Sequence, residues 1–123
     1  MQLGYAIVMV GDMHRSVAFY RDVVGLELRF ESPHWSEFAT GAATLALHHA
    51  DPPPGPAGSA ARPVAGQCRP GLTTDDLDAF HARMVGHGVR CVQKPEMEFG
   101  TRLAQYVDPD GLALSVSEAR RPR

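Results

Sequence analysis

The sequence predicts an α+β fold in which one β-α-β-β-β unit occurs twice. A strand-like segment and an amphipathic helix open the chain, three short strand-like segments follow, and the same order recurs in the second half. With 123 residues, the chain is long enough for one domain with a hydrophobic core. The halves also match position by position, because Val10, Asp12 and Gly25 align with Thr73, Asp75 and Gly88. We therefore expect a single domain with module one at 1–50, a loop at 51–66, module two at 67–118 and a tail at 119–123.

The first half contains the elements of one such unit. Residues 3–10 are rich in Val, Ile and Tyr, as is typical of a strand. Asp12 stands where a helix N-cap is expected. The apolar stripe of that helix consists of Met13, Val17, Tyr20 and Val24, and Gly25 ends it. Turn-forming residues then separate three strands, which we predict at 26–31, 35–40 and 44–49.

The second half repeats these elements. A strand is predicted at 67–73, and a helix begins after Asp75 with Leu77, Phe80 and Met84 as its apolar stripe. Further strands are predicted at 89–93, at 97–99 with 102–107, and at 112–117. A type I turn at Asp108-Pro109-Asp110-Gly111 joins the last two strands. Five of the ten prolines fall within 51–66, which predicts a long exposed loop.

The composition excludes several classes of protein. Twelve basic residues oppose fourteen acidic ones, so no positive excess exists to bind nucleic acid. The longest apolar run, residues 5–10, is too short to span a membrane and lacks the features of a signal peptide. Two cysteines are too few for a disulfide scaffold, and the strand pattern predicts both Cys68 and Cys91 in the core. We expect a cytoplasmic protein that binds neither nucleic acid nor a membrane.

Each unit has one helix for about four strands, so its helix can cover only one face of its sheet. Side chains alternate between the faces of a strand, which places Tyr5, Ile7 and Met9 on the open face of the first strand. On the fourth strand the same alternation places Ala46 and His48 there. In the second unit it places Arg69 and Ser115 on the open face. Such a mixed lining fits a pocket for a partly apolar small molecule.

Three motifs carry a resemblance to a known family. They are Val10-Gly-Asp-Met-His-Arg-Ser-Val-Ala-Phe-Tyr-Arg-Asp-Val-Val-Gly-Leu, Asp75-Asp-Leu-Asp-Ala-Phe, and Phe99-Gly followed by Asp108-Pro-Asp-Gly. With the duplication, they make residues 3–118 resemble the vicinal oxygen chelate superfamily, which includes glyoxalase I, bleomycin-resistance proteins and extradiol dioxygenases. The resemblance implies two βαβββ modules that form a curved mixed sheet around a cavity, with helices on the outer face, and a homodimer.

The resemblance also indicates where a metal would bind. Metal-dependent members hold it through four residues on the open faces of the first and fourth strands of each module, and the matching positions are Tyr5, Ala46, Arg69 and Ser115. None of the four is a histidine or a carboxylate, the residues expected there. Divalent first-row metals bind imidazole, carboxylate or thiolate ligands. We therefore expect no divalent metal and no other cofactor.

Several residues admit two interpretations each. Arg69 could anchor an anionic ligand, or it could pair with a carboxylate across the cavity or the dimer interface. His48 could donate a hydrogen bond or act as a general base, or it could be only the polar end of a strand. The aromatic residues could line a pocket or pack in the core. The candidate ligand-binding residues are Tyr5, Ile7, Met9, Trp35, Ala46, His48, Arg69, Phe99, Arg102, Tyr106 and Ser115.

These observations lead to two hypotheses on function. The first is a metal-independent protein that binds a partly apolar small molecule, anionic if Arg69 anchors it, and sequesters a drug or natural product. The alternative is a lyase, isomerase or dioxygenase of the same superfamily, with or without a divalent metal. In a metal-independent enzyme, His48 or Tyr5 would be the acid–base group and Arg69 would stabilise an oxyanion.

Overall fold

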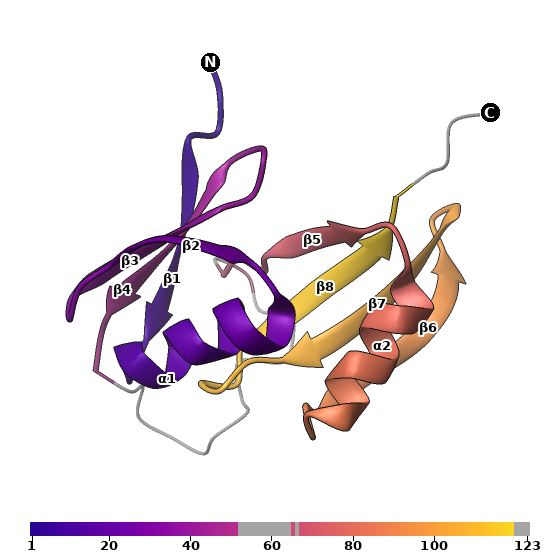
Figure 1. The fold of residues 1–123 in the computed structure, drawn as a ribbon. Helices are drawn as coiled ribbons and strands as arrows, with labels where there is room; N and C mark the ends of the chain where they lie inside the picture. Colours follow the sequence, from indigo (N-terminus) through magenta and orange to yellow (C-terminus); the bar gives the residue numbers. More distant parts are fainter. Residues whose placement is uncertain (52–64, 66, 120–123) are drawn as a thin grey trace. The chain divides into compact units, whose positions relative to one another are not determined.

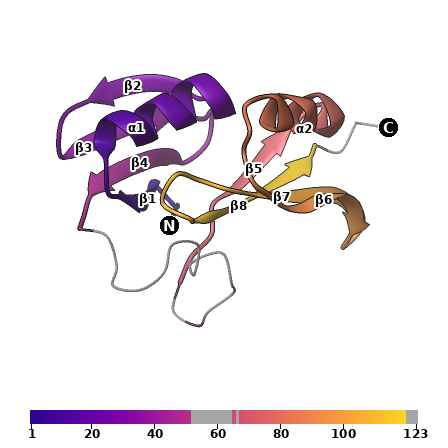
Figure 2. The ribbon, with the colours of Figure 1, turned by 90° about the horizontal axis from the view of Figure 1, so that it is seen from below.

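The computed structural model describes residues 1–51, 65 and 67–119, which form two compact units, Met1–Gly55 and Pro56–Arg123. Each unit contains one four-stranded sheet with helical structure on one of its faces (Figures 1 and 2). The predicted α+β fold with a repeated β-α-β-β-β order is therefore confirmed. Apart from Asp51 and Ala65, the predicted loop at 51–66 lies outside the described residues, as does the tail beyond Ala119.

The first unit is built from β1 (Tyr5–Val10), α1 (Met13–Ala18), η1 (Phe19–Val24), β2 (Glu27–Glu31), β3 (Trp35–Ala39) and β4 (Thr44–His49). Its strand order is β1-β4-β3-β2. Strand β1 runs parallel to β4, and the other neighbouring pairs are antiparallel. Helix α1 packs on β3 and β4, which leaves the opposite face of this sheet without a helix (Figure 1).

The first helical segment begins and ends at the predicted residues. The Asp12 carboxylate accepts a hydrogen bond from the Arg15 backbone N–H at 3.0 Å, as an N-cap does. Gly25 ends the segment at φ 95°, a left-handed conformation that glycine adopts without strain. All four residues of the predicted apolar stripe, Met13, Val17, Tyr20 and Val24, are buried.

The last part of this segment, η1, is a π-helix. The span from Asp12 to Gly25 is one residue longer than the matching span from Asp76 to Gly88 in the second unit. A π-turn takes up one additional residue, which explains how two helices of unequal length occupy equivalent places. This insertion also explains a wrong prediction. The N-cap of the second helix is Asp76, whose carboxylate accepts from the Ala79 N–H at 3.0 Å, and not Asp75.

The second unit is built from β5 (Gly71–Thr74), α2 (Leu77–Gly86), β6 (Cys91–Glu98), β7 (Thr101–Val107) and β8 (Ala113–Glu118). Its strand order, β5-β8-β7-β6, repeats that of the first sheet, and β5 again runs parallel to β8. Helix α2 packs on β6, β7 and β8. The most deeply buried side chains of this core include Leu77, Met84, Tyr106, Leu114 and Val116.

Two strands of the second unit differ from their predicted forms. Strand β5 begins only at Gly71, so Cys68 lies before it and is exposed, and its predicted place in the core is wrong. The segments predicted at 89–93 and 97–99 form parts of a single strand, β6, with two shifts of register against β7. Pro95 lies at the second shift, and a β-bulge there accommodates a residue that has no N–H to donate.

Candidate functional site

The open face of the first sheet presents large side chains from β1. Tyr5, Ile7 and Met9 are 57%, 43% and 57% exposed, whereas Val8 and Val10, which point to the other face, are buried. The predicted alternation is therefore confirmed for these five residues. Ala6 has the same parity as Val8 and Val10, yet it is exposed, because β1 is an edge strand and α1 lies over β3 and β4.

Four residues from three strands gather on this face. The Trp35 indole stands edge-on to the Tyr5 ring, with centroids 6.1 Å apart, and to the His48 ring at 6.2 Å. His48 is paired with Trp35 across β3 and β4 and with Met9 across β1 and β4. Edge-to-face contacts of this kind are favourable for aromatic rings. We call Tyr5, Met9, Trp35 and His48 the aromatic cluster.

A polar network fixes one side of the aromatic cluster. The Glu37 carboxylate accepts a hydrogen bond from the Trp35 indole N–H at 3.1 Å and, through its other oxygen, from the Arg29 guanidinium at 2.8 Å. Arg29 also donates to the Thr44 hydroxyl at 2.7 Å. The hydrogen bond from Arg29, and then that from Trp35, holds the pKa of the Glu37 carboxyl below its ordinary value.

Sequence reasoning did not identify Arg29, Glu37 or Thr44 as candidates. One signal was present for Glu37, because it follows Trp35 by two residues on the same strand and so shares its face. The other two partners come from β2 and β4, and their approach depends on the register between strands.

Ala46 lies at the centre of this face and is fully buried. It is paired with Ile7 of β1 on one side and with Glu37 of β3 on the other. Its methyl side chain offers no atom that could bind a metal ion or donate a hydrogen bond.

The residues present do not fit the metal ion that the family resemblance implies. Tyr5 has an exposed phenol and Ala46 has no ligand atom, while the nearby Glu37 carboxylate is already bound by Arg29 and Trp35. His48 and His49 point to opposite faces of β4, and His49 contacts His34 instead, at 6.3 Å between ring centroids. Among the described residues, no group of three His, Cys, Asp or Glu side chains could hold a metal.

The second unit places two further candidates near its first strand. Arg69 precedes β5, is partly exposed, and forms no ion pair with any described residue. Ser115 is paired with Gly71, on the face opposite to the buried Leu114 and Val116. This face is polar: the Gln93 side-chain amide, for example, donates to Glu98 at 2.9 Å.

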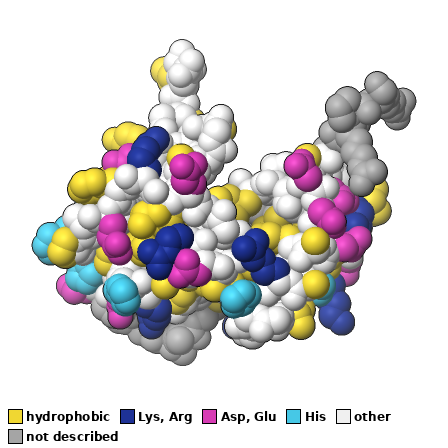
Figure 3. Space-filling view, in the orientation of Figure 1, with side chains coloured by type: hydrophobic (Ala, Val, Ile, Leu, Met, Phe, Trp, Pro, Cys, Tyr) yellow, Lys and Arg dark blue, Asp and Glu magenta, His cyan; other side chains and the backbone are white. Residues whose placement is uncertain are grey.

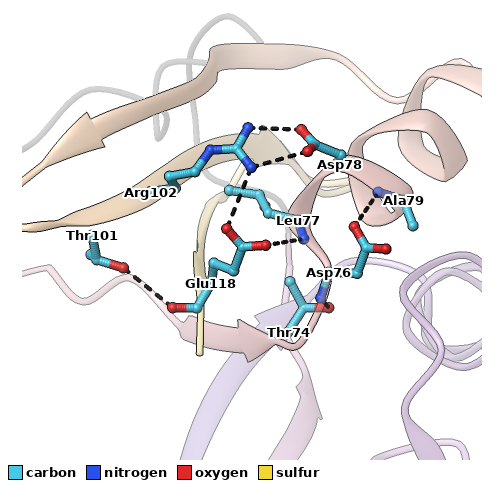
Figure 4. A network of polar contacts seen from close by, with 8 residues as sticks. All are labelled: Thr74, Asp76, Leu77, Asp78, Ala79, Thr101, Arg102 and Glu118. Carbon is cyan, nitrogen blue, oxygen red and sulfur yellow. Dashed lines mark hydrogen bonds and ion pairs between the residues drawn. The ribbon is translucent and has the colours of Figure 1, made fainter. Parts of the chain in front are cut away.

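Arg102 and Tyr106 lie on the side of the second sheet that α2 covers. The Arg102 guanidinium donates to the Asp78 carboxylate at 2.7 and 3.1 Å and to Glu118 at 3.4 Å, and so joins the first turn of α2 to β7 and β8 (Figure 4). Tyr106 is only 1% exposed; its hydroxyl contacts His81 at 2.9 Å, and burial raises its pKa to about 12. Through these contacts, Arg102 and Tyr106 both help to hold α2 against the second sheet.

Phe99 is the remaining candidate. It lies at the tip of the turn between β6 and β7, is 89% exposed, and adopts a positive φ of 53°. Of the predicted set, the structure therefore brings together one group in the first unit: Tyr5, Ile7, Met9, Trp35 and His48 around the buried Ala46.

The described side chains on the face that Figure 3 views mix both signs of charge. Within the described residues, no helix has the length and apolar character needed to cross a lipid bilayer.

Comparison with known proteins gives three kinds of finding. Residues 2–116 match a family model described as the Glyoxalase/Bleomycin resistance protein/Dioxygenase superfamily. No curated protein matches the sequence. Among solved structures, the chain is similar to TnmS3, an antibiotic binding protein from Streptomyces sp. CB03234, with 28% identity and a TM-score of 0.73 over 98% of this chain and 97% of that one.

Two further solved structures share the fold. A protein of unknown function from Agrobacterium tumefaciens str. C58 is 25% identical, with a TM-score of 0.77 over 98% of this chain and 95% of that one. A lactoylglutathione lyase from Agrobacterium tumefaciens is 23% identical, with a TM-score of 0.71 over 94% and 91%. At this lower identity the likeness to the lyase concerns the fold alone.

Proposed function

Because the chain belongs to the glyoxalase/bleomycin resistance protein/dioxygenase superfamily, we propose that it binds a small molecule of the drug or natural-product class without the help of a metal ion. The ligand contacts the open face of the first sheet, where the aromatic cluster lies. The protein sequesters its ligand and performs no covalent chemistry on it. The 28% identity to an antibiotic binding protein over nearly the whole length of both chains supports this proposal.

The observation that carries the proposal is the exposure of the aromatic cluster. Tyr5 and Met9 are each 57% exposed, although both have large apolar surfaces. The Trp35 indole contacts the Tyr5 ring and donates its single N–H to Glu37. Apolar and aromatic side chains exposed together on one face, beside a few fixed polar groups, are typical of ligand sites.

The absence of metal ligands from the four matching positions supports a metal-free site. Within the first unit, the Glu37 carboxylate is already bound by Arg29 and Trp35. The prediction that Arg69 anchors an anionic group concerns the second unit by itself.

Trp35 is the only tryptophan in the chain and can report on binding directly. We expect a panel of antibiotics with aromatic rings to include at least one that changes Trp35 fluorescence in a saturable, one-to-one manner. The Tyr5→Ala and Met9→Ala variants should each bind it about fivefold more weakly, since each loses about 1 kcal/mol of apolar burial. The matched control is Val85→Ala, a similarly exposed apolar residue on α2, which should bind as the wild type does.

The same titration tests the metal-free site. After dialysis against a chelator, the affinity of the wild-type protein should be unchanged. A loss of binding that added zinc, nickel or iron restores would contradict this proposal. Equal affinities of the three variants would contradict the assignment of the site to the aromatic cluster.

A further inference from the structure

The polar network beside the aromatic cluster contains an ion pair that contributes little to the stability of the fold. Arg29 and Glu37 lie on the face of the sheet without a helix, and their side chains are 50% and 32% exposed. Exposed pairs of this kind contribute little to stability. Their geometry is nevertheless specific, because each oxygen of Glu37 has its own donor, from Arg29 and from Trp35.

The contact to Trp35 restricts the indole ring. An indole has a single N–H, so a hydrogen bond at 3.1 Å to a carboxylate on the same strand limits rotation about the bond between Cβ and the ring. The rings of Tyr5 and His48 stand at 89° and 84° to it and contact its other parts. Trp35 is therefore held at a set angle from three directions.

Arg29 in turn restricts Glu37. Its guanidinium bridges the Glu37 carboxylate and the Thr44 hydroxyl, which lie on β3 and β4, while Arg29 itself comes from β2. A glutamate held only by an indole could rotate freely about its side-chain bonds. With Arg29 in place, the carboxylate stays where the indole N–H can reach it.

We propose that Glu37, held by Arg29, is a positioning residue that sets the angle of the Trp35 indole for ligands with flat aromatic rings. This inference rests on the proposed function, since it names the ligand class of the same face. Flat rigid rings gain contact with rings already fixed at right angles, and they lose little conformational entropy when they bind. A flexible aliphatic chain of equal size loses more entropy and gains no ring contact.

The first test concerns the indole and needs no ligand. The single tryptophan gives a single indole N–H signal in a proton–nitrogen correlation spectrum. We expect Glu37→Ala and Arg29→Met to move this signal and to accelerate its exchange with solvent at least severalfold. The matched control is Asp22→Asn, which breaks an exposed Arg21–Asp22 pair with the same 2.8 Å contact on η1. It should leave the indole signal unchanged.

The second test uses two probes of equal charge, 2-naphthoate and decanoate. The wild-type protein should bind the flat probe at least tenfold more tightly than the aliphatic one. Glu37→Ala and Arg29→Met should reduce this ratio at least fivefold, and Asp22→Asn should keep it. Glu37→Gln, which retains an oxygen acceptor for the indole, should restore part of the ratio, a result that loss of folding would not produce.

Three results would overturn the inference. They are an unchanged indole signal in Glu37→Ala, a changed signal without a change in the ratio, and a wild-type protein that does not prefer 2-naphthoate. Failure of the proposed function would look different, since no antibiotic in the panel would then bind to the wild-type protein, whatever the indole signal shows.

Discussion

At the scale of single residues, Arg102 and Asp78 offer a test of what holds α2 to its sheet. The bidentate contact between them, with Glu118 as a second partner of Arg102, spans α2, β7 and β8. The guanidinium of Arg102 holds the pKa of the Asp78 carboxyl below its ordinary value of 3.8. Because the folded-state pKa is lowered, the stabilisation by Asp78 is complete above that ordinary value and is lost as the pH falls through the lowered one.

The prediction is a pH-dependent difference between Asp78→Asn and the wild-type protein. In urea denaturation at about pH 7 the variant should have the lower midpoint, and the difference should shrink as the pH falls below about 4, where the wild-type carboxylate takes up its proton. Asp75→Asn serves as the control, since its carboxylate has no described partner. A difference that stayed constant from neutral to acidic pH would show that the ion pair does not stabilise the unit.

The candidate residues show what sequence alone can place. Strand alternation has a period of two that depends only on the backbone, so it correctly placed Tyr5, Ile7 and Met9 on one exposed face. Arg102 has the same parity as the buried Tyr106, but alternation alone could not identify its partner. The pairing with Asp78 depends on where α2 lies over the sheet. Glu37 was missed for a similar reason, because its role depends on partners from other strands.

At the scale of elements, the end of α2 provides a matched pair of glycines. Gly88 adopts φ 71°, whereas Gly86 is the last helical residue, and an added methyl group would meet no atom within 4 Å at either position. Alanine should therefore destabilise the protein by about 1 kcal/mol at Gly88, since the left-handed region is strained for it.

At Gly86, alanine should stabilise the protein by about 0.5–1 kcal/mol, because it has the higher helix propensity and fewer unfolded conformations. Thermal denaturation of Gly88→Ala and Gly86→Ala checks both expectations at once. Equal changes in the melting temperature would contradict the assigned end of the helix, and so would a higher melting temperature for Gly88→Ala than for Gly86→Ala.

The elements also show where prediction from sequence stops. Burial of one helix face requires the predicted spacing, and Met13, Val17, Leu77 and Met84 are all buried, whereas Phe80 of the second stripe is only partly buried. The choice between two adjacent aspartates as N-cap depended on the additional residue in η1, which no propensity indicates. The start of β5 depended on pairing with β8, a contact between distant parts of the chain.

At the scale of the whole molecule, a homodimer remains the prediction of the family resemblance. One face of each sheet lacks a helix, and large apolar side chains are exposed in both units. Such surface is usually covered by a ligand or a partner. The most exposed of these residues on regular strands or their turns are Tyr5, Met9, Phe30, Met97 and Phe99.

Light scattering at micromolar concentration should give twice the chain mass of 13.3 kDa. Phe99→Ser with Met97→Ser should shift the equilibrium towards the monomer, whereas Val85→Ser on α2 should not. A monomer mass for the wild-type protein would contradict the prediction. The union of both sheets around one cavity likewise stays a prediction of the resemblance.

The order of pairing within each sheet has a consequence for how the chain folds. The first strand of each unit pairs with the last, β1 with β4 and β5 with β8, and both pairs are parallel. Ladders that join distant segments form slowly, since the intervening chain must be ordered first. The hairpin of β2 and β3 and the hairpin of β6 and β7 are local and form early. On the ribosome, all four strands of the first sheet are available for pairing once His49 has emerged, while the second sheet is still being synthesised.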